Sequence, residues 1–496
     1  MKKKNSKVEI IAGPPGTGKT TYLLSILEEE LKHYEPNEIA FVSFTRTGTY
    51  EGRDRAMQKF NYKEDDLPYF RTLHSLAFRE MNARQTDMFN YNDRKRLGKL
   101  IGYNFNHNFT ADLNNNDSVY LFYIDAYRNN PRLGRQIVES GYINSRTLLE
   151  IETNYKNYKR EFSKLDYTDL ILEFVKRNNP LPVKVAIVDE AQDLTTLQWD
   201  MVDIAFRDCD KIYIAGDDDQ AIYEWSGADV GRFIKAYGNL TILKHSYRLP
   251  RNILEFSKTI SNNISNRIDK DFEPATEGGD VKRIREDLIE EFTNNPSVQI
   301  NPDESYLFLS RNRFYLDLFK TALIRVGAPF KIEGKTFHDK SDIDAINTYT
   351  RLQRGLPSPQ VRVNALKRYL INPKMNPNEH WYTALKLDEE HREYYRMVIQ
   401  NKADMSKDPQ IDIRTIHSVK GAEVDHVFLH LNITSAVKRN LQYNPDSEHR
   451  VFYVGATRAK KSLTIVLPDQ RNYYDIDFRW IRSHELLEKT NIWGTE

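Results

Sequence analysis

The chain has a single cysteine, Cys209, so no disulfide can form within it, and small secreted folds that depend on disulfide frameworks are excluded. One cysteine suits a reducing, cytoplasmic compartment. No stretch approaches the run of about 18 apolar residues that a membrane span needs. The lysine-rich N-terminus has no apolar segment of the signal-peptide kind before the first expected strand. We therefore expect a soluble, intracellular protein with no membrane partner.

A charge excess is also lacking, because 72 Lys and Arg residues face 71 Asp and Glu residues and the net charge is +1. Proteins that bind nucleic acid often carry a basic excess, so the composition gives no indication of such a partner. It does not exclude one, because phosphates respond to local patches of charge. With 496 residues, 40% of them hydrophobic, the chain is long enough for about three domains.

Apolar runs alternate with helical patterns in two series, which predicts parallel sheets covered by helices. Strands are expected at 8–12, 39–44, 69–72, 183–188, 211–215 and 240–243, and then at 281–284, 306–309, 330–332, 426–429 and 463–466. Two polar stretches, 86–165 and 353–410, interrupt these series, and we interpret both as mainly helical insertions. The sequence therefore predicts an α/β fold with two parallel-sheet domains, each interrupted once.

Residues 13–20 read Gly-Pro-Pro-Gly-Thr-Gly-Lys-Thr and match the P-loop pattern G-x-x-x-x-G-K-[ST] between an expected strand and an expected helix. Glycines allow the backbone N–H groups to face phosphate oxygens, and the following helix adds its positive end. Lys19 would contact the β and γ phosphates, and the Thr20 hydroxyl would bind Mg²⁺. The candidate nucleotide contacts are Gly13, Pro14, Pro15, Gly16, Thr17, Gly18, Lys19, Thr20 and Thr21.

A pair of carboxylates, Asp189 and Glu190, ends the apolar run 183–188. Open α/β sheets bind ligands at the carboxyl ends of their strands, so both side chains are expected at the nucleotide. Asp189 would hold Mg²⁺, and Glu190 would position and deprotonate the attacking water. Many solvated strand ends also read Asp-Glu, but after a P-loop the pair indicates an ATP-hydrolysing site.

Further motifs follow in a fixed order along the chain. They occupy residues 43–46 with Glu51 and Arg55 behind them, 72–75, 189–193, 216–228, 246–248, 415–423 and 453–459. Taken together, they resemble motifs Ia to VI of the UvrD/Rep/PcrA type of superfamily 1A DNA helicases. The resemblance implies two RecA-like P-loop NTPase domains. Domain 1A would be residues 1–85 and 166–255, insertion 1B residues 86–165, domain 2A residues 256–352 and 411–496, and a reduced insertion 2B residues 353–410.

The resemblance also assigns roles at the ATP site. It implies that Gln220 senses the γ-phosphate and couples it to the DNA groove. Arg248 and Arg458 would reach the γ-phosphate from the second domain, as arginine fingers that neutralise charge in the transition state. Tyr247 would stack on the adenine and Glu423 would contact the ribose. The expected catalytic residues are Lys19, Asp189, Glu190, Gln220, Arg248 and Arg458, with Thr20 and Asp189 as metal ligands.

Single strands are held by bases stacked on aromatic rings and by polar contacts to the backbone. The resemblance implies stacking on Phe44, Tyr223 and Trp225, although rings of this kind more often belong to a core. It also implies backbone contacts from His74 and His417. The full set of expected DNA contacts is Phe44, Thr45, Arg46, Thr72, His74, Tyr223, Trp225 and His417.

The sequence departs from the family pattern in several places, among them Arg46-Thr47 in motif Ia and Ala422 and Val424 in motif V. The twelve residues before Gly13 contain no glutamine, where the family usually reads the adenine edge, so selectivity for ATP is left open. Glu224 and Ser226 stand where arginines usually flank the tryptophan of motif III. Insertion 2B usually exceeds about 100 residues in the family, so the short 353–410 segment predicts weak duplex engagement and weak autoinhibition.

These features predict a DNA-associated, ATP- and Mg²⁺-dependent translocase and helicase for single-stranded DNA. The resemblance implies 3′-to-5′ travel, single-stranded DNA and ss/ds junctions as substrates, and a role with replication, repair or recombination proteins. A monomer is compatible with this. One alternative is a translocase that displaces proteins and hardly unwinds duplex. Others are a nucleotide-gated binding or assembly protein with negligible turnover, and a small-molecule phosphotransferase.

Overall fold

The computed structural model describes residues 7–43, 46–105, 117–134, 143–285, 287–288, 291–292, 300–301, 303–468 and 471–477. The chain divides into two compact units. Unit 1 comprises Met1–Leu249, Ser261–Thr276 and Asn444–Tyr453, and unit 2 comprises Pro250–Ile260, Glu277–Tyr443 and Val454–Glu496. In the described part of the chain, no helix combines the length and apolar character that a membrane crossing requires.

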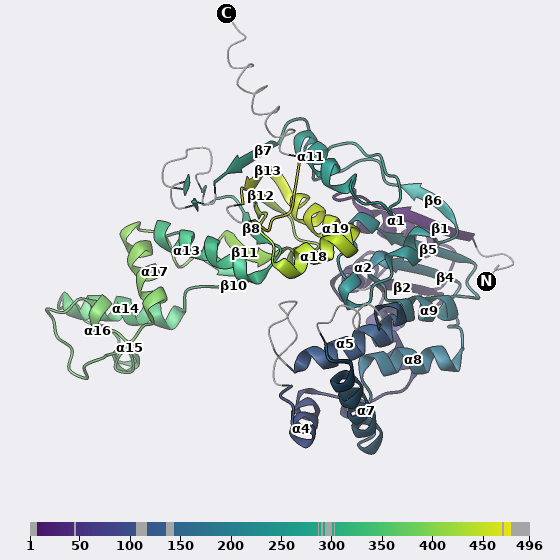
Figure 1. Cartoon of the computed structure of the whole chain (residues 1–496), viewed down its shortest axis with the longest axis horizontal. Helices are drawn as coiled ribbons and strands as arrows, with labels where there is room; N and C mark the ends of the chain where they lie inside the picture. Colours follow the sequence, from purple (N-terminus) through teal and green to yellow (C-terminus); the bar gives the residue numbers. More distant parts are fainter. Residues whose placement is uncertain are drawn as a thin grey trace, which may run out of the picture. The chain divides into compact units, whose positions relative to one another are not determined.

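Unit 1 is built on a six-stranded parallel sheet in the order β3-β2-β4-β5-β1-β6 (Figure 1). Its strands are β1 (Lys7–Ala12), β2 (Ile39–Ser43), β3 (Phe70–Thr72), β4 (Val185–Asp189), β5 (Lys211–Gly216) and β6 (Asn239–Ile242). Every residue of β2 and β4 is buried, as expected for apolar strands in a sheet covered on both faces. The pairing places Ser43 beside Asp189 and Ala12 beside Gly216, so the strand ends that carry the motifs meet at one edge.

Helices cover both faces of this sheet. Those of unit 1 are α1 (Lys19–Glu30), α2 (Arg46–Phe60), α3 (Leu73–Glu80), α4 (Tyr91–Ile101), α5 (Ser118–Asn129), α7 (Ser145–Glu161), α8 (Tyr167–Arg177), α9 (Thr196–Ala205) and α10 (Val230–Ile234). Helix α1 packs Leu23, Leu24 and Leu27 on one face of the sheet. Helices α3, α8 and α9 cover the other face. Strand β1, which leads into the loop before α1, is therefore packed on both faces.

Helices α4, α5 and α7 form a small helical group with its own core, which includes Leu97, Ile124 and Ile151 (Figure 1). Buried ion pairs join this group to helix α8. Arg128 of α5 and Lys159 of α7 both reach Asp166, the N-cap of α8, with the Arg128–Asp166 pair at 2.6 Å. Charged pairs of this kind fix an orientation, because breaking one leaves an uncompensated buried charge.

Unit 2 is built on a seven-stranded sheet in the order β10-β9-β11-β8-β12-β13-β7. Its strands are β7 (Asp280–Ile284), β8 (Tyr306–Ser310), β9 (Phe330–Ile332), β10 (Lys335–Thr336), β11 (Ile411–Thr415), β12 (Val424–His430) and β13 (Ala459–Val466). All neighbouring pairs are parallel except β10 with β9. The expected α/β fold with two mainly parallel sheets is therefore confirmed.

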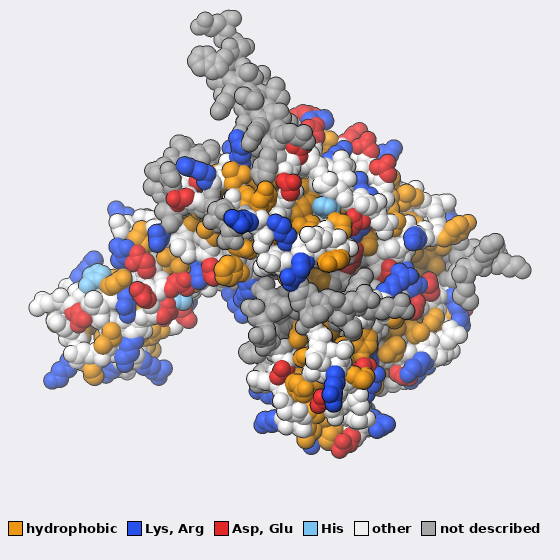
Figure 2. Space-filling view, in the orientation of Figure 1, with side chains coloured by type: hydrophobic (Ala, Val, Ile, Leu, Met, Phe, Trp, Pro, Cys, Tyr) orange, Lys and Arg blue, Asp and Glu red, His pale blue; other side chains and the backbone are white. Residues whose placement is uncertain are grey.

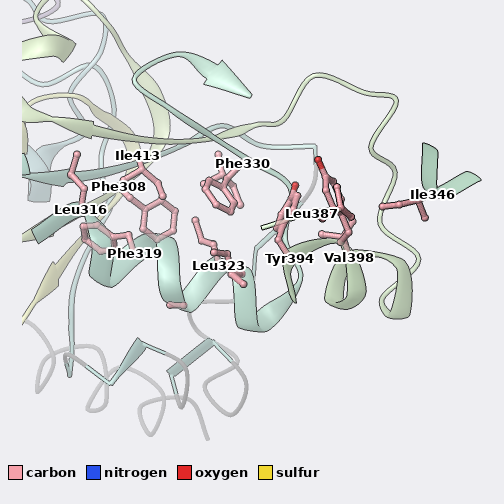
Figure 3. Close-up of a cluster of buried hydrophobic side chains, with 14 of the residues drawn as sticks. Phe308, Leu316, Phe319, Leu323, Phe330, Ile346, Leu387, Tyr394, Val398 and Ile413 are labelled. Atoms are coloured by element: carbon pink, nitrogen blue, oxygen red, sulfur yellow. The ribbon is translucent and has the colours of Figure 1, made fainter. Parts of the chain in front are cut away.

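The helices of unit 2 are α11 (Arg251–Ser261), α13 (Leu316–Val326), α14 (Lys340–Gln353), α15 (Gln360–Leu366), α16 (Trp381–Ala384), α17 (Glu389–Gln400) and α18 (Ser435–Tyr443). Of these, α15, α16 and α17 lie inside the expected insertion 353–410. Helix α17 packs on α13, and one core runs from Phe308 and Phe319 through Phe330 to Tyr394 and Val398 (Figure 3). Part of the segment 353–410 is thus built into the core of unit 2.

Each expected strand is present, but the sequence analysis did not predict the two-residue edge strand β10 or β11, which lies between β9 and β8. The other central strands are apolar runs, whereas β11 reads Ile-Asp-Ile-Arg-Thr, with only its two isoleucines buried. Such a short alternation at the end of a polar segment is a weak signal.

Helix α19 (Pro445–Ala456) belongs to unit 1 up to Tyr453 and to unit 2 from Val454. On the face drawn in Figure 2, Lys and Arg side chains are interspersed with Asp and Glu over both units, in keeping with the balanced composition. Binding of phosphates by this chain therefore has to rest on local arrangements of residues and not on a general positive surface.

Candidate active site and strand-binding surface

The loop between β1 and α1 has the shape of a phosphate cradle. Gly16 and Gly18 have φ angles of 73° and 71°, a left-handed conformation that favours glycine. A Cβ on Gly16 would lie 2.4 Å from Arg248 Cβ, so a side chain is excluded there by contact as well as by conformation. Thr17 Oγ1 donates to the Pro14 carbonyl oxygen at 2.8 Å, which holds the turn closed before α1 begins at Lys19.

The Lys19 ammonium lies between the two carboxylates that end β4. Its Nζ donates to Asp189 Oδ1 and, at 2.6 Å, to Glu190 Oε1. Burial by itself would lower the pKa of Lys19, but the two carboxylates outweigh it and hold this pKa above its ordinary value. Glu190 has a left-handed backbone with φ 52°, which costs a non-glycine residue about 1 kcal/mol or more and is typical of functional sites.

A buried glutamine connects this carboxylate pair to the segment after β5. Gln192 is fully buried, donates to Glu190 Oε2, and accepts a hydrogen bond from the Asp217 backbone N–H at 3.0 Å. Gln220 in turn donates to Asp217 Oδ2 at 2.7 Å. A Cβ on Gly216 would lie 2.4 Å from Gln192 Oε1, so the connection requires glycine at that position. A polar chain thus runs from Glu190 to Gln220.

Residues 246–248 pack directly on the cradle. Ser246 Oγ donates to the Pro15 carbonyl at 3.0 Å, and the Tyr247 N–H donates to the Gly16 carbonyl at 2.7 Å. The Tyr247 ring is 75% exposed and lies beside Gly18, which leaves its face open for stacking. Arg248 belongs to unit 1, so the expectation that it acts from the second domain is wrong. It lies in the same unit as Lys19 because β6 continues straight into this segment.

Three consecutive aspartates after β5 are buried and paired with two basic residues, and we call this set the Lys270 cluster (Asp217, Asp218, Asp219, Arg267 and Lys270). The Lys270 side chain is fully buried and lies 3.0 Å from Asp217 Oδ1 and from Asp219 Oδ2, and it also contacts Asp218. Arg267 donates to both oxygens of Asp219, at 2.9 and 2.6 Å. The cluster fixes the backbone that carries Gln220.

Aromatic rings from two elements form a platform next to this segment. Trp225 and Tyr223 have ring centroids 6.4 Å apart. Phe122 of helix α5 stacks on Trp225 at 5.4 Å with an interplanar angle of 29°. Burial together with the charges of Asp193 and Glu190 raises the pKa of Tyr223 to about 12, so Tyr223 is neutral at pH 7. The platform therefore includes a ring from the helical group, which the sequence reading did not include.

The remaining residues of unit 1 that are expected to contact single-stranded DNA lie before or at the start of helix α2 and around the start of helix α3. The Thr72 hydroxyl caps α3 by accepting the Ser75 N–H at 3.3 Å. His74 contacts the Tyr167 ring edge-on at 5.6 Å, and burial lowers its pKa to about 4, so the imidazole is neutral at pH 7 and offers a hydrogen bond in place of a charge. Phe44 and Thr45 lie outside the described residues, and Arg46 begins helix α2.

Unit 2 carries Arg458, Glu423 and His417. The Arg458 guanidinium donates through Nε to the Val454 carbonyl at 2.9 Å and through Nη1 to the Ala422 carbonyl at 3.2 Å. Glu423 is paired with Lys460 at 3.3 Å, and a little under half of each side chain is exposed. Burial and the nearby Arg311 charge lower the pKa of His417 well below its ordinary value, so His417 is also neutral at pH 7.

The oxygen-rich corner of unit 1 suits a nucleotide phosphate with Mg²⁺. Mg²⁺ prefers carboxylate and hydroxyl oxygens and is usually held by one or two protein groups together with phosphates. Asp189 and Glu190 supply the carboxylates, and Thr20 in the first turn of α1 supplies a hydroxyl. Gly13 and Gly16 leave no room for a Cβ, because it would meet the Lys19 side chain at Gly13 and Arg248 and Ser246 at Gly16. The carboxylate and hydroxyl oxygens at the end of β4 and the start of α1 are donors of the kind that Mg²⁺ takes, so the residues present fit the group.

The structure brings together several residues that the sequence reading did not assign. Gln192 lies within the Asp189–Asp193 motif, so its motif was recognised without its role. Phe122 lies in the aromatic-rich segment Tyr120-Leu121-Phe122-Tyr123, which is a weak signal in a segment that matches no motif. Lys270 had no local signal, because its partners lie about 50 positions earlier in the chain.

Two models of known protein families match the chain. Residues 1–241 match the family described as the UvrD/REP helicase N-terminal domain. Residues 393–470 match the family described as the UvrD-like helicase C-terminal domain. Together the two matches span more than half of the 496 residues.

Individual relatives agree with this. The ATP-dependent DNA helicase Rep of Buchnera aphidicola (subsp. Acyrthosiphon pisum) is 25% identical over 389 residues, which cover 70% of this chain and 59% of that protein. The chain thus spans less than two thirds of this relative. The probable DNA helicase II homolog of Rickettsia felis is 24% identical, with 94% of this chain and 91% of that protein covered. An arterivirus helicase structure has a TM-score of 0.35 at 11% identity, covering 94% of this chain and 60% of that one, a likeness too low to support any conclusion. On the two family matches, the chain is a member of the UvrD/REP helicase family.

Proposed function

We propose that this protein is an ATP-hydrolysing motor that moves along single-stranded DNA and unwinds DNA. The observation that carries the proposal is the polar chain from the Lys19–Glu190 corner through Gln192 and Asp217 to Gln220, which leads into the Tyr223–Trp225 platform. An ATPase that is stimulated by single-stranded DNA needs a nucleotide site that is connected by hydrogen bonds to a surface on which bases can stack. Relatives named as ATP-dependent DNA helicases support the same reading.

Within this proposal each residue has a physical task. The Lys19 side chain and the backbone N–H groups of Gly16, Gly18, Lys19 and Thr20 bind the phosphates. Thr20 and Asp189 would hold Mg²⁺, which neutralises phosphate charge when bound. Glu190, oriented by Gln192, accepts a proton from the attacking water. Tyr247 stacks on the adenine. The remaining roles are those expected from the motifs, with Arg248 and Arg458 on the γ-phosphate, Gln220 as its sensor, and Glu423 on the ribose.

The domain boundaries, the 3′-to-5′ direction and the substrates remain part of the proposal. Single-stranded DNA and ss/ds junctions are the proposed substrates, and replication or repair proteins are the proposed partners. A protein-displacing translocase with little unwinding is the second candidate. The observation that favours this second candidate is the small size of the segment 353–410. Helix α17 of this segment packs into the core of unit 2, which leaves a shorter part of the segment outside that core.

The first expected result is stimulation of ATP turnover by a single-stranded DNA oligonucleotide, measured as steady-state phosphate release. Lys19→Ala is expected to lower the stimulated rate by about 10²-fold or more, because it removes the charge that stabilises the phosphates in the transition state. The control is Lys176→Ala, which removes an exposed lysine paired with Glu173 and should leave the rate unchanged.

Strand separation on 3′- and 5′-tailed duplexes then distinguishes the two candidates. Unwinding of the 3′-tailed duplex supports the helicase, whereas stimulated turnover with displacement of a bound protein and no strand separation supports the translocase. A rate that does not respond to single-stranded DNA, in protein with an intact melting transition, contradicts both.

Phe122 is expected to contribute to strand binding through its contact with Trp225. Phe122→Ala should raise the Kd for a fluorescently labelled single-stranded DNA by about 10-fold, because one stacking interaction is worth about 1–3 kcal/mol. ATP binding in the absence of DNA should be unchanged, since Phe122 lies on α5 and the cradle lies between β1 and α1.

Tyr237→Ala is the matched control for Phe122. Tyr237 is an aromatic residue of the same unit that is 94% exposed and lies just before β6. Its removal should leave the strand affinity unchanged. If Phe122→Ala binds the strand as tightly as the unmodified protein, Phe122 is a packing partner of Trp225 and not a part of the platform.

A further inference from the structure

Glu224 has a charged partner where the family usually has an arginine. Its Oε1 accepts from Arg450 Nη1 at 2.7 Å, and its Oε2 accepts from Asn444 Nδ2 at 3.1 Å. The Arg450 side chain is 2% exposed and that of Glu224 is 18% exposed. An arginine at position 224 would place two guanidinium groups against each other, so the acidic residue and Arg450 belong together in this chain.

Arg450 uses every nitrogen of its guanidinium. In addition to Glu224, it donates through Nε to the Asp218 carbonyl at 2.8 Å and through Nη2 to the Asn266 carbonyl at 2.7 Å. One turn earlier on the same face of helix α19, Asp446 accepts the backbone N–H groups of Ser265 and Asn266 at 2.9 Å each. The first half of α19 is therefore hydrogen-bonded to both segments that form the Lys270 cluster, at Asp218 and at residues 265–266.

The other half of the same helix leads to Arg458. Helix α19 ends at Ala456, and Arg458 ties itself back to its last turn through the Nε bond to the Val454 carbonyl. Its Nη2 also donates to Thr457 Oγ1 at 3.1 Å. Helix α19 is continuous over twelve residues, so its hydrogen-bonded backbone connects the turns that carry Asp446 and Arg450 to the turn that precedes Arg458.

The Trp225 ring and the Glu224 carboxylate share one short 3₁₀ turn, Glu224–Ser226. Gly227 closes this turn with a φ angle of 111°, and the Gly227 N–H donates to the Glu224 carbonyl at 3.0 Å. Trp225 and Glu224 are neighbours in this turn, and Glu224 is joined to Arg450 by a buried ion pair. The covalent chain and this ion pair therefore connect the Trp225 ring to helix α19.

We propose that Glu224 and Arg450 are positioning residues that transmit occupancy of the strand platform to Arg458 through helix α19. The proposal rests on the proposed function, because it assigns the route by which a bound single strand accelerates ATP hydrolysis. It also gives a reason for the departure at position 224. The carboxylate does not contact the strand backbone as an arginine would, but holds the helix that ends at the motif of Arg458.

The test is Glu224→Ala together with the milder Glu224→Gln, assayed for turnover with and without a saturating single strand. Losing a hydrogen bond to a charged group is expected to lower the ratio of stimulated to unstimulated turnover by about 10-fold in Glu224→Ala. The Kd for the single strand should change by less than about 2-fold, because Trp225 and Tyr223 remain. Glu224→Gln keeps the shape of the side chain, so its ratio of stimulated to unstimulated turnover should lie between those of the unmodified protein and Glu224→Ala.

Glu277→Ala is the matched control, because Glu277 forms an exposed ion pair with Arg251 at 2.5 Å and should leave the ratio unchanged. A Glu224 variant whose two rates fall in parallel with its melting temperature would show a purely structural role and overturn the proposal. An unchanged ratio in both Glu224 variants would overturn it as well. If the unmodified protein shows no stimulation, the proposed function itself fails.

Discussion

Arg458→Ala is expected to lower ATP hydrolysis by about 10³-fold while ATP binding stays nearly intact. Arginine fingers neutralise charge that develops on the γ-phosphate in the transition state, and losses of this size follow their removal. Binding of the ground state depends mainly on Lys19 and the cradle, which this change does not touch. Phosphate release at saturating ATP with single-stranded DNA measures the first effect, and titration with a fluorescent ATP analogue measures the second.

Two further variants separate catalysis from folding at this position. The Arg458 guanidinium also bonds to the Val454 and Ala422 carbonyls, so Arg458→Lys should be assayed beside Arg458→Ala. Lysine keeps the charge but lacks the planar fork, and a rate well below that of the unmodified protein is still expected. Arg251→Ala, which removes an exposed arginine of the same unit, serves as the control. Turnover at the unmodified rate in Arg458→Ala would remove Arg458 from the site.

Lys270→Met is expected to destabilise the protein by about 3–5 kcal/mol, the usual cost of removing one partner from a buried set of charges. Lys270 is fully buried, and its loss leaves three aspartates with Arg267 as the remaining cation of the Lys270 cluster. Methionine is close to lysine in size, so the cost comes from charge and not from a cavity. Urea unfolding followed by circular dichroism at pH 7.5 measures the difference.

The control for Lys270→Met is Lys176→Met, which replaces an exposed lysine in an ion pair and should stay within about 0.5 kcal/mol of the unmodified protein. A loss of less than about 1 kcal/mol in Lys270→Met would mean that the aspartates find other partners or water. In that case the cluster would not be what fixes the segment that carries Gln220.

The destabilisation by Lys270→Met should also depend on pH. In the unmodified protein, burial by itself would raise the pKa of Asp219, but Lys270 and Arg267 outweigh it and hold this pKa below its ordinary value. Asp219 therefore adds stability above the unfolded pKa of about 4, and this stability is lost as pH falls through the lower folded pKa. Without Lys270, burial raises the carboxyl pKa values, and protonation relieves the buried charge. The difference between the two proteins should be larger at pH 7.5 than at pH 5, and a pH-independent difference would contradict this.

Local patterns were sufficient where a residue's role depends on its own neighbours in the chain. The P-loop at residues 13–20 is recognisable because phosphate binding needs glycines and a lysine at fixed spacing before a helix. The expected strands are present because parallel strands buried on both faces read as apolar runs. Strand β11 escaped because its alternation is short and follows a polar segment.

The sequence by itself determined the α/β class, the parallel sheets and the family of this protein, because those depend on periodicity and on motifs in a fixed order. Only the tertiary structure decided that Phe122 stacks on Trp225, that Lys270 lies among three aspartates, and that Glu224 pairs with Arg450. The partners in these contacts lie about 50 to 230 positions apart. Folding of the sheets brings them together, and no local pattern records which distant side chain will face another.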